Sequence, residues 1–461
     1  MLVPLGLSLY YSEGDAWIFA ESSAIIGVSG ALMLFLFRGG GYEIRHREGF
    51  FIVVVSWVAA SLDGALPFML SEHFLSFADA VFESVSGITT TGASVLDDVE
   101  ALPHGLLFWR SELHWIGGVG IVLLSLAILP LLGVGGMQLF KAESSGLTTD
   151  KFVPRVKEMS RIIVAVYLTF SIVLVVLLNL LGMNLFDAVI HMFGTVSTGG
   201  FSSSSESIGG YHSVYIESVI IIFMILGATS FALHYKYSKE GFKVYTRNSE
   251  FKFFSLLMIV STLLISVNLW GNYYSSLSDS IRHAAFQVVS VVTTTGYGTS
   301  DFASWPAFGQ IMILVLMFAG GCAGSTTGSI KCIRLLLLIK LIYRQFIKLV
   351  HPRAVLPVKL AGKVVPDGVM VGVQGFIALY LLVFIVSALG LNGMGVDFTT
   401  AISSAAATLS NVGPALGLTG PLANFSVIPE PGKWILIFDM LLGRLEISTL
   451  IILFIPAFWS G

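Results

Sequence analysis

Charge and cysteine are both scarce in this chain. Of its 461 residues, 11% are charged, whereas soluble domains average about 25%. The two cysteines, Cys322 and Cys332, form neither a disulfide framework nor a zinc-binding pattern. The sequence also lacks a Walker A motif and a dinucleotide fingerprint, and its net charge is −3. These absences argue against a nucleotide-binding enzyme and against a nucleic-acid-binding protein.

Apolar residues are abundant instead. They make up 55% of the chain, and the mean hydropathy is +0.86. Apolar stretches of roughly 20 residues, enough to cross a ~30 Å hydrocarbon core, recur along the whole sequence. We therefore predict an all-α polytopic membrane protein with no separate soluble domain. The predicted membrane helices occupy approximately 16–37, 50–70, 105–132, 160–182, 213–236, 252–271, 308–345 (interrupted), 368–391 and 433–458.

Lysine and arginine predict the topology. Four segments, 38–47, 141–161, 236–252 and 331–363, hold 21 of the 25 basic residues, and the positive-inside rule places such segments in the cytoplasm. Because helix 16–37 must then run inward, a preceding helix must run outward from a cytoplasmic N-terminus. Only 11 residues precede Ser12, so we expect that first membrane helix to be truncated.

Four windows of the sequence repeat a pattern of small and hydroxyl-bearing residues. Each begins with Ala and ends with Gly twelve residues later, in segments too short to cross a membrane: AVFESVSGITTTG (80–92), AVIHMFGTVSTGG (188–200), AAFQVVSVVTTTG (284–296) and AISSAAATLSNVG (401–413). One such window would indicate helix packing. Four in register indicate an internal repeat.

The order of the windows predicts a pore. Two membrane crossings separate successive windows, so all four enter from the outer side as short helices followed by re-entrant loops. Irregular backbone at membrane depth is tolerated where it is buried in protein or lines a water-filled cavity. Four loops around one axis would present a ring of carbonyl oxygens that replaces the hydration shell of an alkali cation. The short helices would point their negative C-terminal ends inward, which favours a cation. Their expected bounds are Ala80–Ile88, Ala188–Val196, Ala284–Val292 and Ala401–Leu409.

Further motifs resemble the TrkH/KtrB superfamily of bacterial potassium transporters along essentially the whole chain. They are LPLLGVGGMQLFKAE (129–143), GGCAGSTTGSIKCIRLLLL (320–338), KLVHPRAVLPVK (348–359) and MLLGRLEISTLIILFIPAFW (440–459). The resemblance implies four helix–pore loop–helix repeats around a central pore, after two extra N-terminal helices. Residues 1–48 are expected to form the N-terminal helices. The four repeats are expected at 49–140, 141–236, 237–350 and 351–461.

The resemblance also implies function and partners. We expect potassium uptake across the bacterial inner membrane, through a homodimer with one pore per protomer and a cytoplasmic ring of TrkA-type nucleotide-binding subunits. K⁺ is the transported ion, and no organic cofactor is expected in this chain. The expected filter residues are Thr90, Thr91, Gly92, Thr198, Gly199, Gly200, Thr294, Thr295, Gly296, Asn411, Val412 and Gly413. Four glycines favour potassium over sodium, whereas the threonine-poor fourth window predicts weaker K⁺/Na⁺ discrimination.

A gate is expected below the filter. The glycine and hydroxyl residues of FAGGCAGSTTGSIK (318–331) interrupt a long apolar stretch, and the corresponding segment of the family is an intramembrane gate loop. The expected gate residues are Gly320, Gly321, Cys322, Ala323, Gly324, Ser325, Thr326, Thr327, Gly328, Lys331 and Arg444. Lys331 lines the inner vestibule or extends to the cytoplasmic interface. An arginine at membrane depth needs protein or water around it, so Arg444 lies either beside the gate or in an ion pair with Glu446, Asp439 or Glu112.

A symporter and an intramembrane enzyme are the two alternative classes of protein. A K⁺ symporter coupled to H⁺ or Na⁺ needs a carboxylate buried in the membrane, for which Asp63 and Asp439 are candidates within spans; parallel repeats favour a pore over the inverted repeats common in symporters. An intramembrane enzyme needs a nucleophile, base or metal ligands that converge at depth. The sequence shows no such cluster, so a non-enzymatic transport protein is expected.

Overall fold

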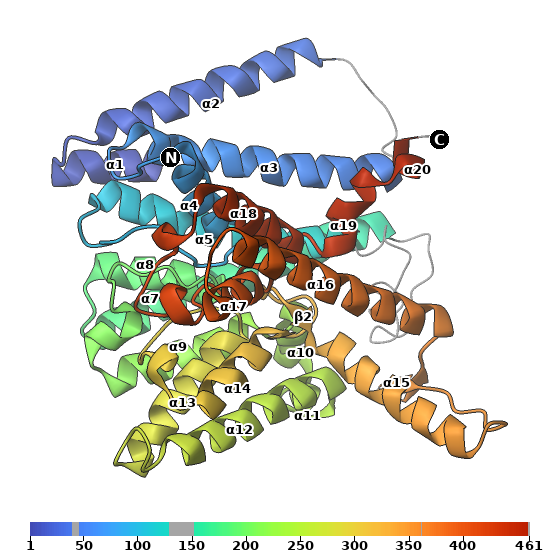
Figure 1. Cartoon of the computed structure of the whole chain (residues 1–461). Helices are drawn as coiled ribbons and strands as arrows, with labels where there is room; N and C mark the ends of the chain where they lie inside the picture. The colour runs from blue at the N-terminus through green and yellow to red at the C-terminus, as the bar shows by residue number, and fades with distance from the viewer. Residues whose placement is uncertain (39–45, 129–151, 361, 460–461) are drawn as a thin grey trace.

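The protein is a bundle of helices whose long axes run in roughly the same direction (Figure 1). This computed structural model describes residues 1–38, 46–128, 152–360 and 362–459. The α-helices are α1 (Leu2–Tyr11), α2 (Ala16–Leu36), α3 (His46–Leu70), α4 (Phe77–Ile88), α5 (His104–Ile128), α7 (Phe152–Leu180), α8 (Leu185–Val196), α9 (Val214–Gly227), α10 (Phe231–Glu240), α11 (Lys243–Arg247), α12 (Ser249–Leu269), α13 (Leu277–Val292), α14 (Ala307–Met317), α15 (Cys332–Val350), α16 (Asp367–Gly393), α17 (Phe398–Leu409), α18 (Glu430–Arg444), α19 (Ile447–Ile451) and α20 (Pro456–Trp459).

Short strands and 3-10 turns complete the described elements. The strands β1 (Ala319–Gly320) and β2 (Ile330–Lys331) pair in parallel, and β3 (Lys359–Leu360) and β4 (Lys363–Val364) pair antiparallel. The 3-10 turns are η2 (Ser207–Tyr211), η3 (Phe302–Ser304), η4 (Gly417–Thr419), η5 (Phe425–Val427) and η6 (Ile452–Phe454).

A three-helix unit follows α1 and α2 four times. Each unit has a long first helix (α3, α7, α12, α16), a short pore helix (α4, α8, α13, α17) and a second helix (α5, α9, α14, α18). We call them units 1 to 4. This order agrees with the predicted repeats, and the polytopic helical fold is confirmed. The exact divisions at 49, 141, 237 and 351 stay a prediction.

The pore helices begin at side-chain caps and end at the predicted filter. In each, a residue before the first turn accepts a hydrogen bond from a first-turn N–H: Ser76, Asn184, Ser276 and Asp397. Such caps contribute about 1 kcal/mol each. The helices end at Ile88, Val196, Val292 and Leu409, which are the ends that the four windows predicted. Most residues of these helices are buried, so they form the centre of the bundle.

Long apolar helices surround this centre. Five of the described helices, α2, α3, α7, α12 and α16, are long and apolar enough to cross a membrane. The pair α9 and α10, bent by 97° at a break, passes the same test together. The molecule is therefore a multi-pass membrane protein.

Two predicted helices are shorter than expected. The helix predicted over 213–236 ends at Gly227, because the chain turns there and the carbonyl of Ala228 accepts a hydrogen bond from Cys322 at 2.8 Å instead of continuing the helix. The helix predicted over 433–458 ends at Arg444, and Glu446 adopts a left-handed φ of 61°. For the helix predicted over 105–132, residues 129–132 lie outside the described residues.

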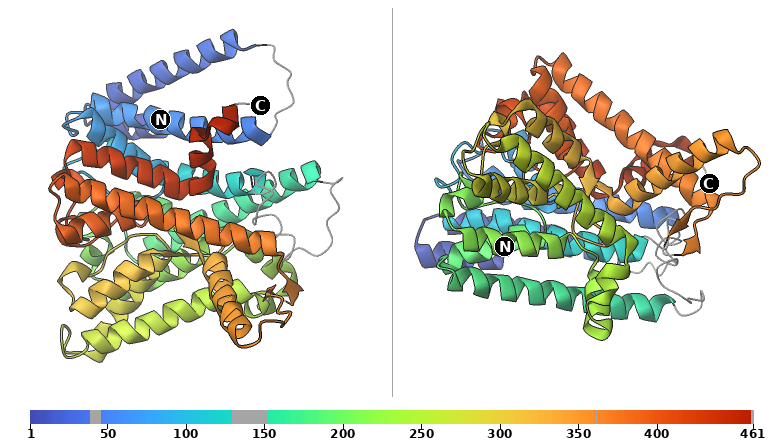
Figure 2. Two further views of the ribbon diagram at one scale, coloured as in Figure 1. Left: turned by 45° about the vertical axis from the view of Figure 1, so that its right-hand side comes forward. Right: turned by 90° about the horizontal axis from the view of Figure 1, so that it is seen from below.

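The bundle has two end faces. We call the one with segments 93–103, 201–213, 297–306 and 414–429, which follow the filter turns, the mouth face. The opposite end, with α10, α11, most of α15 and the β3–β4 hairpin, is the basic face. Figure 2 shows α15 and the hairpin projecting from the rest of the bundle at that end. Parts of two basic segments predicted to be cytoplasmic, 39–45 and 141–151, lie outside the described residues.

Candidate ion filter and gate

The four predicted filter segments make the same backbone turn. A residue just after each pore helix has a left-handed φ: Thr90 (52°), Thr198 (56°), Thr294 (53°) and Asn411 (53°). The next N–H in each segment bonds a carbonyl five residues back, at 2.7–2.9 Å: Thr91 to Ser86, Gly199 to Gly194, Thr295 to Ser290, and Val412 to Ala407. A left-handed φ is rare for a β-branched residue. It persists where the surrounding structure holds the backbone in place, so the turn is imposed by the fold.

The glycines that end the windows close a ring. They have positive φ values: Gly92 (82°), Gly200 (84°), Gly296 (82°) and Gly413 (96°). A Cβ on each would collide with a carbonyl oxygen of the next unit: from Gly92 to Gly199 at 2.2 Å, from Gly200 to Thr295 at 1.9 Å, from Gly296 to Val412 at 2.1 Å, and from Gly413 to Thr91 at 2.5 Å. Each glycine thus lies against the residue that precedes the next glycine, and unit 4 returns to unit 1.

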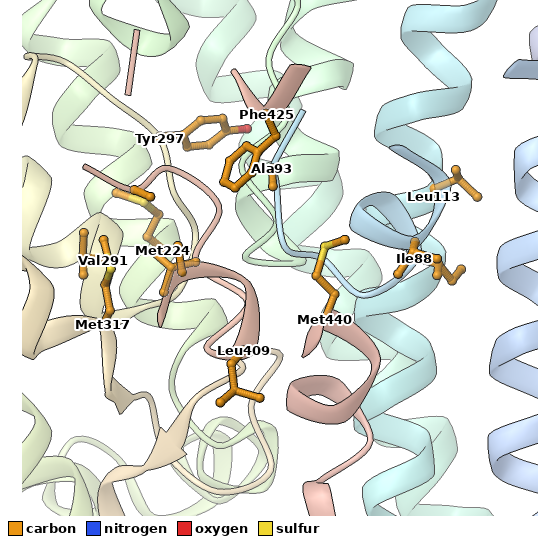
Figure 3. Close-up of a cluster of buried hydrophobic side chains, with 14 of the residues drawn as sticks. Ile88, Ala93, Leu113, Met224, Val291, Tyr297, Met317, Leu409, Phe425 and Met440 are labelled. Carbon is orange, nitrogen blue, oxygen red and sulfur yellow. The ribbon is translucent and has the colours of Figure 1, made fainter. Parts of the chain in front are cut away.

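This ring has the chemistry of a cation site. Its backbone oxygens come from four sides, and the filter threonines of units 1 to 3 are buried. The pore helices end at the same place, so their C-terminal ends add partial negative charge. Figure 3 labels Ile88, Val291 and Leu409, which lie at or next to the ends of three pore helices. Such an arrangement can hold a dehydrated alkali cation.

Polar side chains tie each pore helix to the segment after its filter turn. The fourth position of every window carries one, and each bonds across the turn: Glu83 to Ser94 at 3.0 Å, His191 to Ser202 at 3.1 Å, Gln287 to Ser300 at 3.0 Å, and Ser404 to Thr419 at 2.8 Å. The sequence interpretation missed this set. The signal was present, since the fourth position is polar in all four windows.

Unit 3 departs from the others below the filter. Its second helix, α14, ends at Met317, and β1 and β2 bring the two ends of segment 319–331 together, with Ala319 opposite Ile330. We call residues 321–329 the loop. The side chains of Cys322, Ser325, Thr326 and Thr327 are buried. The predicted interruption of the apolar stretch is therefore observed, and it is a compact hydrogen-bonded segment.

The loop bonds directly to the filter turns. The amide of Gly328 donates to the hydroxyl of Thr294 at 2.9 Å, and the hydroxyl of Thr198 donates to that of Thr326 at 3.1 Å. A Cβ on Gly328 would lie 2.8 Å from side-chain atoms of Asn411. The loop thus contacts the inner ends of the turns in units 2, 3 and 4.

Arg444 holds the loop from unit 4. Its guanidinium donates to the carbonyl of Thr326 at 2.6 Å and to the carbonyl of Gly117, on α5, at 3.1 Å, and the residue is 2% exposed. The side chain therefore joins the loop to units 1 and 4. Planar guanidinium donors suit two separate carbonyl acceptors.

The ion-pair interpretation of Arg444 is not what the structure shows. Glu446 bonds Arg334 at 2.6 Å, and Asp439 accepts from Ser387 at 2.8 Å. Among the described residues, Arg444 has no salt bridge, because both its bonded partners are backbone carbonyls. The other bases outside the clusters do pair: Arg110 with Glu83, Arg282 with Glu217 and Lys433 with Asp79.

Lys331 turns back onto the loop. Its ammonium bonds the carbonyl of Thr327, and it lies 2.9 Å from the hydroxyl of the same residue and 3.5 Å from the carbonyl of Gly328. The sequence left two positions open for the Lys331 side chain, the inner vestibule and the cytoplasmic interface. The structure does not show the side chain extending to the interface. Glu250 supports the loop from α12, accepting from the amides of Ala323 at 2.8 Å and Ile333 at 3.1 Å.

Four filter turns and a loop beneath them are a specific arrangement, and comparisons with known proteins identify it. A family model described as TrkH, cation transport protein, matches residues 17–460. The chain belongs to the TrkH family. The Trk system potassium uptake protein TrkH of Escherichia coli K12 is 42% identical over 463 residues, with 100% of this chain and 95% of that protein covered. TrkG of the same strain is 40% identical over 464 residues, with the same coverage of both chains.

A solved structure of the TrkH family agrees with the fold. The crystal structure of the potassium transporter TrkH from Vibrio parahaemolyticus matches with a TM-score of 0.91 and 39% sequence identity. The match covers 99% of this chain and 95% of that one. The unit order and the interrupted second helix of unit 3 thus belong to a TrkH-type fold, and the chain is a transport protein rather than an enzyme.

Proposed function

We propose that this TrkH-family protein takes up potassium, with Rb⁺ as a substitute, across the bacterial inner membrane. The ring of glycines is the observation that carries the proposal. Its filter residues are Thr90, Thr91, Gly92, Thr198, Gly199, Gly200, Thr294, Thr295, Gly296, Asn411, Val412 and Gly413. Their backbone oxygens replace the water shell of K⁺, which is the cargo and needs no organic cofactor.

The loop and Arg444 form the gate in this proposal. The loop, residues 321–329, lies below the filter turns and is bonded to Thr198 and Thr294. Gly320 and Lys331 mark its two ends, where β1 and β2 pair. The guanidinium of Arg444 repels a passing cation while its hydrogen bonds hold the loop in place. Opening then requires both the loop and Arg444 to move aside.

The basic face supports the orientation that we propose. By the positive-inside rule this face is cytoplasmic, and the mouth face and the N-terminal ends of the pore helices then face outside. A TrkA-type nucleotide-binding ring docks on the basic face, where segments 236–252 and 331–363 lie. Segment 141–161 is the third basic segment for which we propose contact with the ring, although its residues 141–151 lie outside the described residues. Charge reversal at Lys141, Lys151 and Arg155 is expected to weaken capture of a TrkA-type partner in a pull-down. Unchanged capture would mean that these basic residues only set the membrane topology.

A homodimer is supported by α15. Along the part of this helix that projects from the bundle, Ile339, Ile342, Phe346 and Leu349 recur at helical spacing and are exposed, Phe346 by 63% and Leu349 by 78%. A second copy of the chain is the partner we propose for this stripe, with lipid around the remaining apolar surface. Phe346→Glu is expected to convert the dimer to a monomer in light scattering; a dimer of unchanged mass would contradict this surface.

A symporter coupled to H⁺ or Na⁺ is the second candidate, and Asp439 is the observation that favours it. This carboxylate on α18 is buried, its Oδ1 accepts from Ser387 at 2.8 Å, and its Oδ2 has no hydrogen-bond partner among the described residues. Buried acids in membrane helices often mark ion or proton pathways. No nucleic-acid partner is proposed.

One measurement tests the two candidates. Reversal potentials of the purified protein in a planar bilayer are recorded under K⁺/Na⁺ bi-ionic conditions, with and without a pH gradient. A pore gives a K⁺-selective potential that the pH gradient does not move, because no proton crosses with the ion. A shift with the pH gradient that disappears in Asp439→Asn would establish symport instead.

A further inference from the structure

The second helices of the four units can be aligned on one glycine each: Gly117, Gly227, Gly320 and Gly443. Three of them lie against the last carbonyl of their own pore helix, with Cβ positions 1.9 Å from Ile88, 3.1 Å from Val196 and 2.0 Å from Leu409. Gly320 lies against Gly328 of the loop, 2.3 Å from its oxygen. The alignment therefore relates positions at the same depth in units 1, 2 and 4, and in unit 3 it rests on the sequence, with Gly320 three residues beyond the end of α14.

Unit 1 differs from the others behind the filter. Three residues before the aligned glycine, units 2 to 4 have Met224, Met317 and Met440; seven residues before it, they have Ile220, Ile313 and Leu436. All six side chains are buried, and Figure 3 labels the three methionines in the buried cluster. Unit 1 instead has His114 and Arg110, which are buried as well.

His114 hydrogen-bonds on both sides of the junction between units 1 and 2. The amide of Phe201, next to Gly200, donates to its Nε2 at 3.2 Å, so Nδ1 carries the proton and donates to the carbonyl of Gly87 at 2.7 Å. The imidazole also stacks on the ring of Phe201 at 4.1 Å. A Cβ on Gly199 would lie 2.5 Å from Cγ of His114, so the imidazole packs directly on filter backbone.

Arg110, one turn earlier on α5, binds the same segment. Its Nε donates to Glu83 of α4, and its Nη1 donates to the carbonyl of Ser202 at 3.2 Å. Its guanidinium lies 3.7 Å from the centre of the Phe201 ring. Glu83 also accepts from the amide of Val95 at 3.0 Å, just beyond the filter turn of unit 1.

We propose that Arg110 and His114, with Glu83 between the turns, form a clamp that sets the K⁺/Na⁺ discrimination of the filter. The clamp is a pair of positioning residues, because it touches the filter backbone and not the ion. Its hydrogen bonds are directional and join residues 87, 201 and 202 to α5. A methionine at the same depth fills space but is flexible and makes no such directional bond. The carbonyl of Gly199, which lies against Gly92, therefore stays at one distance from the axis.

This inference rests on the proposed filter, and the test separates the two. His114→Met installs the residue that the three other units carry, so the space is filled while both hydrogen bonds are lost. Glu83→Gln/Arg110→Leu removes the charged pair together, so that neither charge is left buried alone. Permeability ratios are measured from K⁺/Na⁺ reversal potentials. We expect each variant to lower the ratio roughly tenfold, the change that follows from about 1.4 kcal/mol of differential binding.

Three further variants make the result decisive. His114→Gln can accept from Phe201 and donate to Gly87, so it is expected to keep the ratio within about threefold. Met224→Leu, the matched change in unit 2, is expected to keep the parent ratio. If His114→Met loses flux or thermal stability but keeps the ratio while Gly92→Ser loses it, the clamp is structural and the inference is overturned. If Gly92→Ser also keeps the ratio, the filter assignment fails with it.

Discussion

At the filter, the four units repeat one turn, with φ of 52–56° at its first residue and a glycine of φ 82–96° at its end. Directly below, the second helices diverge. Among the described residues, α5 continues to Ile128, α9 bends by 97° into α10, α14 breaks into the loop, and α18 ends at Arg444. One sequence repeat therefore produces a symmetric layer and an asymmetric layer in contact with each other.

The difference follows from what each layer has to do. A dehydrated cation is best coordinated when oxygens surround it, so every unit has to supply the same backbone geometry. Closing a pore needs one obstruction, which a single unit can supply. The aligned positions show this, because Arg444 stands where the other units have Gly118, Ala228 and Gly321.

The largest effect is expected where the ring is broken. In Gly92→Ser, a side chain at φ 82° would meet the carbonyl of Gly199 at 2.2 Å. The ring must widen, and we expect the K⁺/Na⁺ permeability ratio to fall tenfold or more. The matched control is Gly241→Ser, which also has a positive φ, 69°, but no neighbour within 4 Å. Reversal potentials that are equal in Gly92→Ser and the parent would show that the ring does not select the ion.

Arg444→Ala is expected to have the next largest effect. A monovalent cation passing ~8 Å from the guanidinium at an effective dielectric of ~20 meets about 2 kcal/mol of repulsion, which is roughly a thirtyfold change in rate. Removing it also frees the loop from one anchor, so Rb⁺ uptake into proteoliposomes without the regulatory partner should rise by at least that factor.

A charge-retaining variant separates the two contributions of Arg444. Arg444→Lys keeps the repulsion but loses the planar fork that reaches both carbonyls, so a smaller rise is expected. Deleting residues within 322–328 removes the obstruction itself and should raise uptake in the same direction. Lower or unchanged flux through a folded Arg444→Ala dimer would make Arg444 a structural residue.

Thr326→Val is expected to act more weakly on the same gate. The variant loses the hydrogen bond of the hydroxyl with Thr198 at 3.1 Å and its bond to the carbonyl of Gly227 at 3.0 Å. A net loss of about 1 kcal/mol corresponds to roughly a fivefold rise in partner-free Rb⁺ uptake. Thr169→Val is the control, because the hydroxyl of Thr169 bonds a carbonyl of its own helix. Equal uptake by the two variants would show that the hydrogen bond between Thr326 of the loop and Thr198 of the filter is not part of the gate.

The smallest effect is expected at the mouth face, where Glu100 joins the loops of units 1 and 2. Burial alone would raise the pKa of Glu100, but hydrogen bonds from Ser205 and Ser204 outweigh it and lower the pKa to about 2. A carboxylate whose pKa is lowered by folding stabilises the folded state at pH values above its unfolded-state pKa of about 4.3. This stabilisation is lost as the pH falls toward the folded-state pKa. The contribution is small because the carboxylate is partly solvated.

The pH dependence can be isolated with Glu100→Gln. Its unfolding midpoint in detergent should be slightly below that of the parent at pH 7, and the gap should close between about pH 5 and pH 2. A gap that stays constant over this range would mean that the carboxylate does not hold the two loops together by its charge.

The repeat pattern and the hydropathy of the sequence determined the class of fold, the four pore helices and the turns at their ends. These features are local, because every unit has the same pattern of a capped short helix followed by small and hydroxyl-bearing residues. The helix ends at Ile88, Val196, Val292 and Leu409 could therefore be predicted. The interrupted helix of unit 3 was also visible, because glycine density is a local property. That the four turns lie around one axis was expected from the count of crossings.

Tertiary structure alone decided what the buried polar side chains contact. The sequence offered three carboxylates as ion-pair partners for Arg444. In the structure it bonds the carbonyls of Thr326 and Gly117 instead, which are 118 and 327 residues away along the chain. The end of α9 at Gly227 was missed for the same reason, since the partners that satisfy its carbonyls come from the loop. A buried polar group takes whichever partner packing brings to it, and one-dimensional spacing does not contain that information.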